Sequence, residues 1–260
     1  MTEKSLRFHI DSGIARITLN RPSKLNALTR DLMIDLGAAV AESASRQDVR
    51  VISLSGTGRA FSAGQDLSER DPRKLDGPLD LAEIQREIFH PVVKGLIDAP
   101  KPVVACVTGV AAGAGAGIAL AADIVVASET AKFVFSFAKI GLSVDAGLGR
   151  ALARGLGIPR AKALLMLGES LSASEAAEAG LIWRALPDDE LAEQHEALLR
   201  RLAETPRESL IGIKAALSKS HLDVPDYLEA EAQAQGRAGS HPDYAEGVLS
   251  FLERRAPRFS

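Results

Sequence analysis

The stretch of this sequence that most constrains its fold is Pro102 to Asp123, which reads PVVACVTGVAAGAGAGIALAAD. Its first part, up to Val107, is a continuous apolar and largely β-branched run, typical of a buried strand. Small residues follow from Gly113 to Gly117 and lead into a helix-forming segment over residues 118–122. None of these small residues carries a functional side chain. The predicted strand, loop and helix junction therefore offers only backbone N–H groups and room for close approach.

Such a junction has several known uses. A phosphate cradle does not fit, because the glycine spacing is G-x-G-x-G and the run from Gly113 to Gly117 contains no lysine, serine or threonine. Tight helix packing and presentation of amide groups to a reacting oxygen both stay open. A second stretch, Phe61 to Leu67 (FSAGQDL), follows a predicted strand at Val49 to Ser55 and a glycine-containing turn. Two strands that end in small-residue turns can bring two N–H groups to one point, which is the geometry of an oxyanion hole.

Taken jointly, these motifs resemble the crotonase (enoyl-CoA hydratase/isomerase) superfamily, and the likeness runs over essentially the whole chain. The matching segments are Asn20-Arg21-Pro22, Asn26-Ala27-Leu28, Ala60 to Leu67, Val103 to Asp123, LSASEAAEAGLI at Leu171 to Ile182, and the tail EGVLSFLERRAPRF. The resemblance implies an α/β fold built as a crotonase-like spiral of ββα units over residues 1–200. It also implies a C-terminal helical region over residues 201–260 that assembles a homotrimer or a dimer of trimers.

The local patterns agree with an α/β core followed by a helical tail. Thr29 or Asp31 is expected to cap a helix, and Ser172 with Glu175 forms a capping box. Strands are expected at residues 6–10, 14–19, 49–55, 102–107, 124–127 and 132–137, with an edge strand at 181–186. Later helices are expected at residues 81–97 with a kink or break at Pro91, and from Pro187, Pro206, Pro225 and Pro242.

Composition narrows the class of protein. The 260 residues are 46% hydrophobic, enough for a sizeable core, and the net charge of −3 argues against nucleic-acid or membrane-surface partners. The single cysteine, Cys106, fits a reducing compartment, and MTEKSLRFHI lacks the apolar core of a signal peptide. Histidines are scattered without ligand spacing, so no metal site is expected. We expect a soluble cytoplasmic enzyme that needs no cofactor beyond the coenzyme A of its substrate.

The resemblance assigns two oxyanion donors. They are the N–H of Gln65, which follows the glycine of the first turn, and the N–H of Ala114, the middle residue of Gly113-Ala114-Gly115. The alanine keeps the amide, and its methyl group is harmless only if the local φ is negative. The implied target is the thioester oxygen of an acyl-CoA, which becomes negative as an enolate forms. Each such donor typically contributes about 3–4 kcal/mol to the transition state.

The catalytic side chains depart from those of the hydratases in this family. Hydratases hold a water molecule between two glutamates, and the matching positions here are Gly117 and Phe137. Neither residue can move a proton, which argues against simple hydration. Asp145, in FVFSFAKIGLSVDAGLGRAL, remains nearby, and this segment resembles the branch that isomerises ring-epoxide and unsaturated acyl-CoAs in phenylacetate-type catabolism. An acid in apolar surroundings has a raised pKa, so Asp145 can carry a proton from one carbon to another.

Alternatives stay open for Asp145 and for the whole chain. Asp145 is also well placed to cap a helix over residues 149–156. It could act as a nucleophile, as in dehalogenating members of the superfamily, with His90 as the nearby candidate to activate water. The remaining readings are an enoyl-CoA hydratase, an acyl-CoA hydrolase, and a non-catalytic acyl-CoA or RNA-binding homologue.

Substrate contacts follow from the resemblance. The coenzyme A arm is expected along two backbone segments, and further contacts are expected at the glycine triplet and the second hydratase position. The expected residues are Lys24, Leu25, Ala27, Ala63, Asp66, Leu67, Gly113 and Phe137. Arg21, Lys24 and Lys74 could meet the phosphates. The charged stretch Ser68 to Asp80 is expected to be an irregular surface loop or a lid over the acyl pocket.

Overall fold

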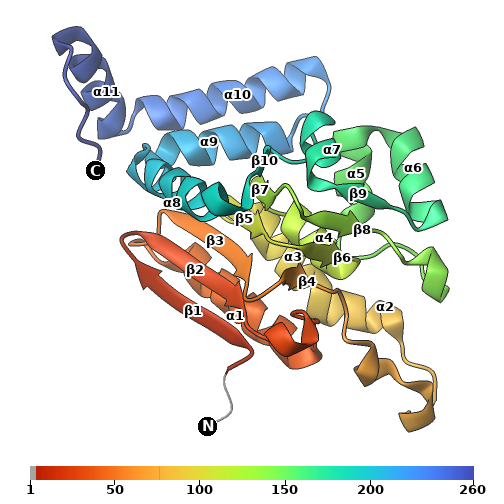
Figure 1. The fold of residues 1–260 in the computed structure, drawn as a ribbon. Helices are drawn as coiled ribbons and strands as arrows, with labels where there is room; N and C mark the ends of the chain where they lie inside the picture. The colour runs from red at the N-terminus through yellow and green to blue at the C-terminus, as the bar shows by residue number, and fades with distance from the viewer. Residues whose placement is uncertain (1–3, 76) are drawn as a thin grey trace.

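The computed structural model describes residues 4–75 and 77–260, which fold into two β-sheets surrounded by helices (Figure 1). The larger sheet has the order β1 (Leu6–Asp11), β2 (Ile14–Leu19), β3 (Val51–Gly56), β5 (Val103–Val107), β7 (Ile124–Ser128), β10 (Arg184–Leu186). The smaller sheet has the order β4 (Ala60–Ser62), β6 (Val110–Ala112), β8 (Lys132–Val134), β9 (Ser170–Ser172). Strands β1 and β9 pair antiparallel with their neighbours, and the other pairs are parallel.

Eleven α-helices lie within the described residues. They are α1 (Arg30–Ser45), α2 (Leu81–Ile84), α3 (His90–Asp98), α4 (Ala114–Leu120), α5 (Leu148–Leu156), α6 (Ile158–Leu167), α7 (Ala173–Glu178), α8 (Asp188–Glu204), α9 (Arg207–Ser218), α10 (Val224–Gly239) and α11 (Pro242–Glu253). The cap of α1 is Thr29, which accepts a hydrogen bond from Leu32 N, and the capping box predicted at Ser172 is confirmed.

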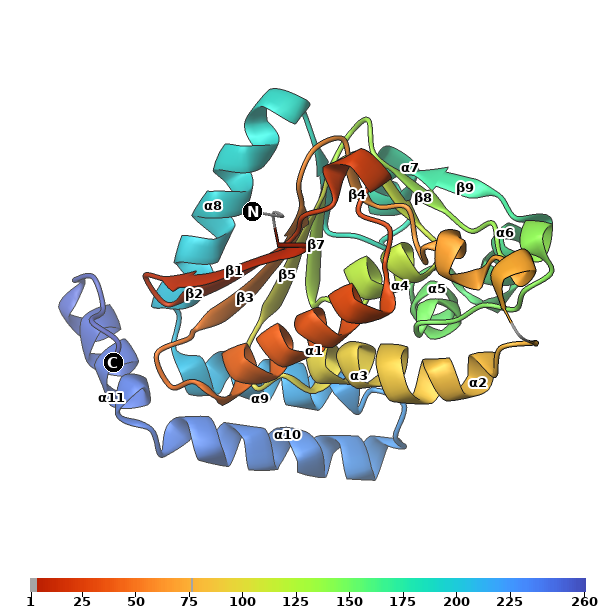
Figure 2. The same ribbon diagram turned by 90° about the horizontal axis from the view of Figure 1, so that it is seen from below.

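Helices cover both faces of the larger sheet (Figure 2). On one face, Val51 and Val104 pack against Leu199 and Leu202 of α8. On the other face, α1, α3, α4 and the smaller sheet enclose the main core, to which Ile52 belongs. All five residues of β5 are buried, because helices and strands cover both of its faces, which is what the continuous apolar run predicted.

The central junction differs from the expected strand, loop and helix. Residues 110–112 form the additional short strand β6, and α4 begins at Ala114 rather than at residue 118. Strand β6 pairs with β4 and β8, so it is stabilised by two neighbours that lie far away in the sequence. A strand of three residues is too short to show periodicity, which is why the sequence pattern missed it.

The helix expected at residues 81–97 is divided, as the presence of Pro91 predicted, but the division is a π-helical turn that precedes the proline. A π-helical turn, Gln85–Phe89, joins α2 to α3, and Pro91 lies in the first turn of α3. Pro91 has no N–H group and its ring would clash with a carbonyl four residues earlier in a regular helix. The wider π turn accommodates the proline without ending the helix.

The C-terminal helices lie at the edge of the molecule, with α11 projecting away from the sheets (Figures 1 and 2). The expected division after residue 200 falls inside α8, which continues to Glu204. In the charged loop, two 3-10 turns form at Leu67–Arg70 and Pro72–Lys74, and Asp76 lies outside the described residues. No helix in residues 4–75 and 77–260 combines the length and the apolar character needed to cross a bilayer.

Candidate active site

The two glycine-containing turns lie side by side because the strands before them are paired. Strand β4 runs parallel to β6, with Ser62 opposite Ala111, so the turns leave the sheet at the same edge. Gly64 has a φ of +87°, and a Cβ atom on it would lie 2.8 Å from Ala112 O and 3.8 Å from Ala114 N. Only glycine fits this position. Its absent side chain allows the turn that carries Gln65 to approach the start of α4.

Both expected oxyanion donors have unused N–H groups. In the first turn, Ala63 N–H donates to Leu25 O (2.8 Å) and Asp66 N–H to Leu28 O (2.9 Å), whereas no described group accepts from the N–H of Gln65. Ala114 is the first residue of α4, where backbone N–H groups have no partner inside the helix.

The alanine in the glycine triplet is tolerated. The positive φ of this segment falls on Gly113 (+50°), and Ala114 is not among the described residues with positive φ. The Ala114 side chain is buried, so its methyl group adds packing without backbone strain. Ala114 therefore has the negative φ that an alanine needs at this position, and its N–H group can act as a donor.

Asp145 lies at these turns. Its Oδ2 atom accepts hydrogen bonds from Gln65 Nε2 (2.5 Å) and Gln85 Nε2 (3.0 Å). The helix-capping alternative for Asp145 is wrong. Helix α5 begins at Leu148 after Gly147, without a side-chain cap, and Asp145 contributes only its backbone carbonyl to Leu148 N–H (3.0 Å).

A tight turn directly after Asp145 positions its side chain beside Gln65 and Gln85. Ala146 and Gly147, with φ of +49° and +72°, are consecutive left-handed residues, and for a buried alanine this conformation is uncommon and strained. Ala146 packs directly on α4 at Gly117. A Cβ atom on Gly117 would lie 2.6 Å from Ala146 O and 2.8 Å from Ala146 Cβ. The space that a side chain at position 117 would need is thus occupied by the turn that carries Asp145.

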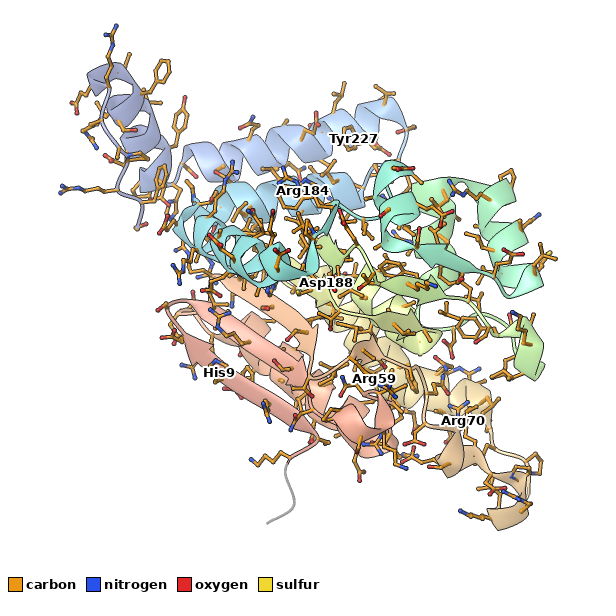
Figure 3. All side chains as sticks on the ribbon, in the orientation of Figure 1. His9, Arg59, Arg70, Arg184, Asp188 and Tyr227 are labelled. Atoms are coloured by element: carbon orange, nitrogen blue, oxygen red, sulfur yellow. The ribbon has the colours of Figure 1, made fainter. Side chains whose placement is uncertain are left out.

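Burial raises the pKa of the Asp145 carboxyl to about 6. The Arg70 guanidinium, the hydrogen bond from Gln85 and the charge of His90 each act in the opposite direction and limit the rise. Figure 3 labels Arg70, which projects from the segment between β4 and α2. A carboxyl with this pKa exchanges protons readily near neutral pH.

Most of the large apolar side chains from Phe133 to Leu148, the segment that leads to and follows Asp145, are at least partly buried. Phe133, Phe135 and Leu148 are fully buried, and the Phe137 ring lies 3.7 Å from the position that a Cβ atom on Gly113 would take. Phe137 therefore faces the glycine triplet with a hydrocarbon surface and no proton to give. Val144, by contrast, is 36% exposed and lies against Gly149.

The two segments expected to hold coenzyme A form a short ladder. Besides the bond from Ala63 to Leu25, Leu28 N–H donates to Gly64 O (2.8 Å). Arg21 fastens the segments together, because its Nη1 donates to Ala27 O (2.5 Å) and to Asp66 Oδ2 (2.9 Å).

These hydrogen bonds show which of the residues expected to contact coenzyme A already use their side chains within the protein. The Nη1 atom of Arg21 is engaged with Ala27 O and Asp66 Oδ2, so Arg21 is ion-paired within the protein, and its expected contact with phosphate stays a prediction. The other Asp66 oxygen accepts from Ser68, so a contact between Asp66 and substrate would use its backbone. Lys24, Leu67 and Lys74 are exposed. Among the residues described, no group of three His, Cys, Asp or Glu side chains is placed to hold a metal ion.

Sequence reasoning missed two features of this site. Gln65 was expected to act only through its backbone, but its side chain also binds Asp145. Gln85 lies within the helix expected at residues 81–97 and was assigned no role there. The π turn beginning at Gln85 has no simple sequence signature beyond the nearby Pro91.

Comparison with known proteins agrees with this geometry. The family model described as enoyl-CoA hydratase/isomerase matches residues 9–260. The 1,2-epoxyphenylacetyl-CoA isomerase of Escherichia coli (strain K12) is 40% identical over 253 residues, covering 97% of each chain. A protein of Rhodobacter capsulatus named probable enoyl-CoA hydratase is 39% identical over 261 residues, covering 100% of this chain and 99% of the relative.

A solved structure shows the same fold. The crystal structure of a candidate enoyl-CoA hydratase/isomerase from Mycobacterium abscessus superimposes with a TM-score of 0.94 at 33% sequence identity. The match covers 98% of this chain and 99% of that one.

Proposed function

The chain belongs to the enoyl-CoA hydratase/isomerase family, and from that membership we propose that it isomerises acyl-CoA thioesters through an enolate. The fold is that of the crotonases. The observation that carries the proposal is the place of Asp145, a buried carboxyl hydrogen-bonded to the side chain of the same Gln65 whose N–H is free.

The proposed reaction needs one acid. The Asp145 carboxylate removes a proton from C2 of a 3-enoyl-CoA, and the electron pair moves through the thioester carbonyl to give a dienolate. The N–H groups of Gln65 and Ala114 stabilise the negative oxygen. The protonated Asp145 then returns the proton to C4, which yields the 2-enoyl-CoA, so every atom is accounted for. An enolate formed at the thioester could also be the intermediate in the rearrangement of a ring-epoxide acyl-CoA. A compound of this class is the substrate in the name of the Escherichia coli relative.

Addition of water is less well supported. In the hydratases that this chain resembles, two glutamates hold the water, and here those positions are Gly117 and Phe137. A side chain at position 117 would collide with Ala146, and the Phe137 ring cannot hold or deprotonate water.

The test compares Asp145→Asn with the wild type on 3-enoyl-CoA in deuterated water. The amide keeps the shape but removes the base, so we expect isomerisation to fall by about 10²–10⁴-fold. Asp35→Asn, a matched change on the exposed face of α1, should leave the rate unchanged. The proposal fails if Asp145→Asn isomerises at the wild-type rate.

Two assays separate the alternatives. Formation of 3-hydroxyacyl-CoA from 2-enoyl-CoA would identify a hydratase. Transfer of oxygen-18 from a labelled enzyme carboxylate to product would identify a nucleophilic Asp145 in a hydrolase or dehalogenase.

We further propose that the protein assembles as a trimer through its helical region. Large apolar side chains on α10 and α11 are exposed in the single chain, including Val224 (69%) and Phe251 (82%). Exposed apolar surface of this kind is typical of a protein interface. Light scattering would give three times the mass of the 27.5 kDa chain, or six times for a dimer of trimers.

A further inference from the structure

The two oxygens of Asp145 have different surroundings. Oδ2 receives both glutamine Nε2 groups, whereas Oδ1 is buried and has no hydrogen-bond partner among the described residues. The carbonyl oxygens of Gln65 and Gln85 are buried and unpartnered there as well. An ionised carboxylate only accepts hydrogen bonds, so both amides must present nitrogen to it and turn their oxygens away.

These contacts come from three separate parts of the chain. Gln65 follows β4, Asp145 precedes α5, and Gln85 opens the π-helical turn between α2 and α3. A π turn adds one residue and rotates the side chains before it relative to those after it. This is how Gln85 reaches Asp145 while Ile88 and Phe89 of the same turn remain in the core.

We infer that Gln65 and Gln85 are positioning residues, which hold Oδ2 of Asp145 and leave Oδ1 as the atom that exchanges the proton with the acyl chain. The inference rests on the proposed isomerase function. Two donors on one oxygen fix the plane of the carboxyl group and stabilise its ionised form. Because amides are uncharged, they do this without the permanent ion pair that would make Asp145 a poor base. Oδ1 becomes a hydrogen-bond donor only when it takes up the proton.

Charged groups near Asp145 act separately from this pair of amides. Arg70, from the 3-10 turn after β4, and His90, at the start of α3, both favour the carboxylate through their charge. A variant that removes an amide leaves the side chains of Arg70 and His90 unchanged. A shift in the titration of Asp145 in such a variant therefore reports the lost hydrogen bond.

The experiment uses Gln85→Leu and Gln65→Leu, each of which deletes one donor at similar volume. Gln65→Leu keeps its backbone N–H, so the oxyanion donor survives. We expect kcat to fall about tenfold, with KM for the acyl-CoA within threefold. The midpoint of the acidic limb of the rate profile should rise by about one pH unit, as expected for loss of a hydrogen bond to a charged group. Gln85→Glu should raise the midpoint further, because a second carboxylate disfavours ionisation of the first.

The control is Gln194→Leu, the same change on the exposed face of α8, which should alter neither kcat nor the pH midpoint. A purely structural role for the glutamines would lower the amount of folded enzyme without moving the midpoint. The inference is overturned if either folded leucine variant keeps the wild-type midpoint.

A second readout does not depend on activity. Infrared titration of the Asp145 carboxyl, identified by its absence from Asp145→Asn, gives the midpoint in wild type and in each glutamine variant. If the wild type does not isomerise acyl-CoA, the proposed function fails, and this titration still tests the role of the amides. An unchanged carboxyl midpoint in either leucine variant would refute it.

Discussion

The contact between Gly117 and Ala146 leads to the sharpest prediction. In Gly117→Ala, the new Cβ atom would lie 2.6 Å from Ala146 O and 2.8 Å from Ala146 Cβ. Ordinary contact begins at 3.4 Å, so the turn or the helix must move by about 0.8 Å. Both contacting atoms belong to a buried and strained turn, which has no flexible side-chain end to absorb the shift.

The expected effect falls on catalysis more than on folding. Overpacking of this kind typically costs about 1–3 kcal/mol of stability. A misplacement of about 1 Å at a catalytic group lowers the rate by about 10²-fold. Because Ala146 directly follows Asp145, we expect kcat to fall by about 30- to 100-fold. KM should change little, since the segments expected to hold coenzyme A lie in other loops.

The assay is steady-state isomerisation of 3-enoyl-CoA, together with urea unfolding to confirm that the variant is folded. Gly236→Ala in α10 is the matched control, because a Cβ atom on that helical glycine meets nothing within 4 Å. Its kcat should equal that of the wild type. A folded Gly117→Ala enzyme with kcat within threefold of wild type would refute the argument that Gly117 sets the position of Asp145.

Two further predictions concern stability and binding. The pKa of Asp145 is about 6 in the native state, against an ordinary value of 3.8. Between pH 4 and 6 the native state therefore binds more protons than the unfolded state. The free energy of unfolding consequently falls as the pH rises through that range. Asp145→Asn should therefore gain roughly 2–3 kcal/mol relative to wild type between pH 4 and pH 8, measured by urea unfolding; a difference that does not vary with pH would contradict this. Arg21→Met removes the hydrogen bonds to Ala27 O and Asp66, which hold together the two segments expected to bind coenzyme A. We expect KM for acyl-CoA to rise about tenfold, with a smaller change in kcat. An unchanged KM would show that the ladder forms without Arg21.

Much of the fold followed from local sequence patterns. The apolar run at Val103 to Val107 predicted a strand buried on both faces, and Ser172 with Glu175 predicted a helix start; both are confirmed. These predictions succeeded because period, capping and turn chemistry are local properties of a few neighbouring residues. Strand β6 and the early start of α4 were missed, because pairing with β4 and β8 stabilises a segment too short to have a pattern.

The sequence by itself determined the family, the two backbone turns and the candidate acid, because glycine spacing and an aspartate after KIGL are visible in one dimension. Only the tertiary structure decided what Asp145 touches. Its contacts to Gln65 and Gln85 join residues 80 and 60 positions away, and its place depends on an absent side chain at Gly117. Contacts of this kind are set by how helices and strands pack. No local pattern can therefore distinguish a helix cap from a buried acid held by two amides.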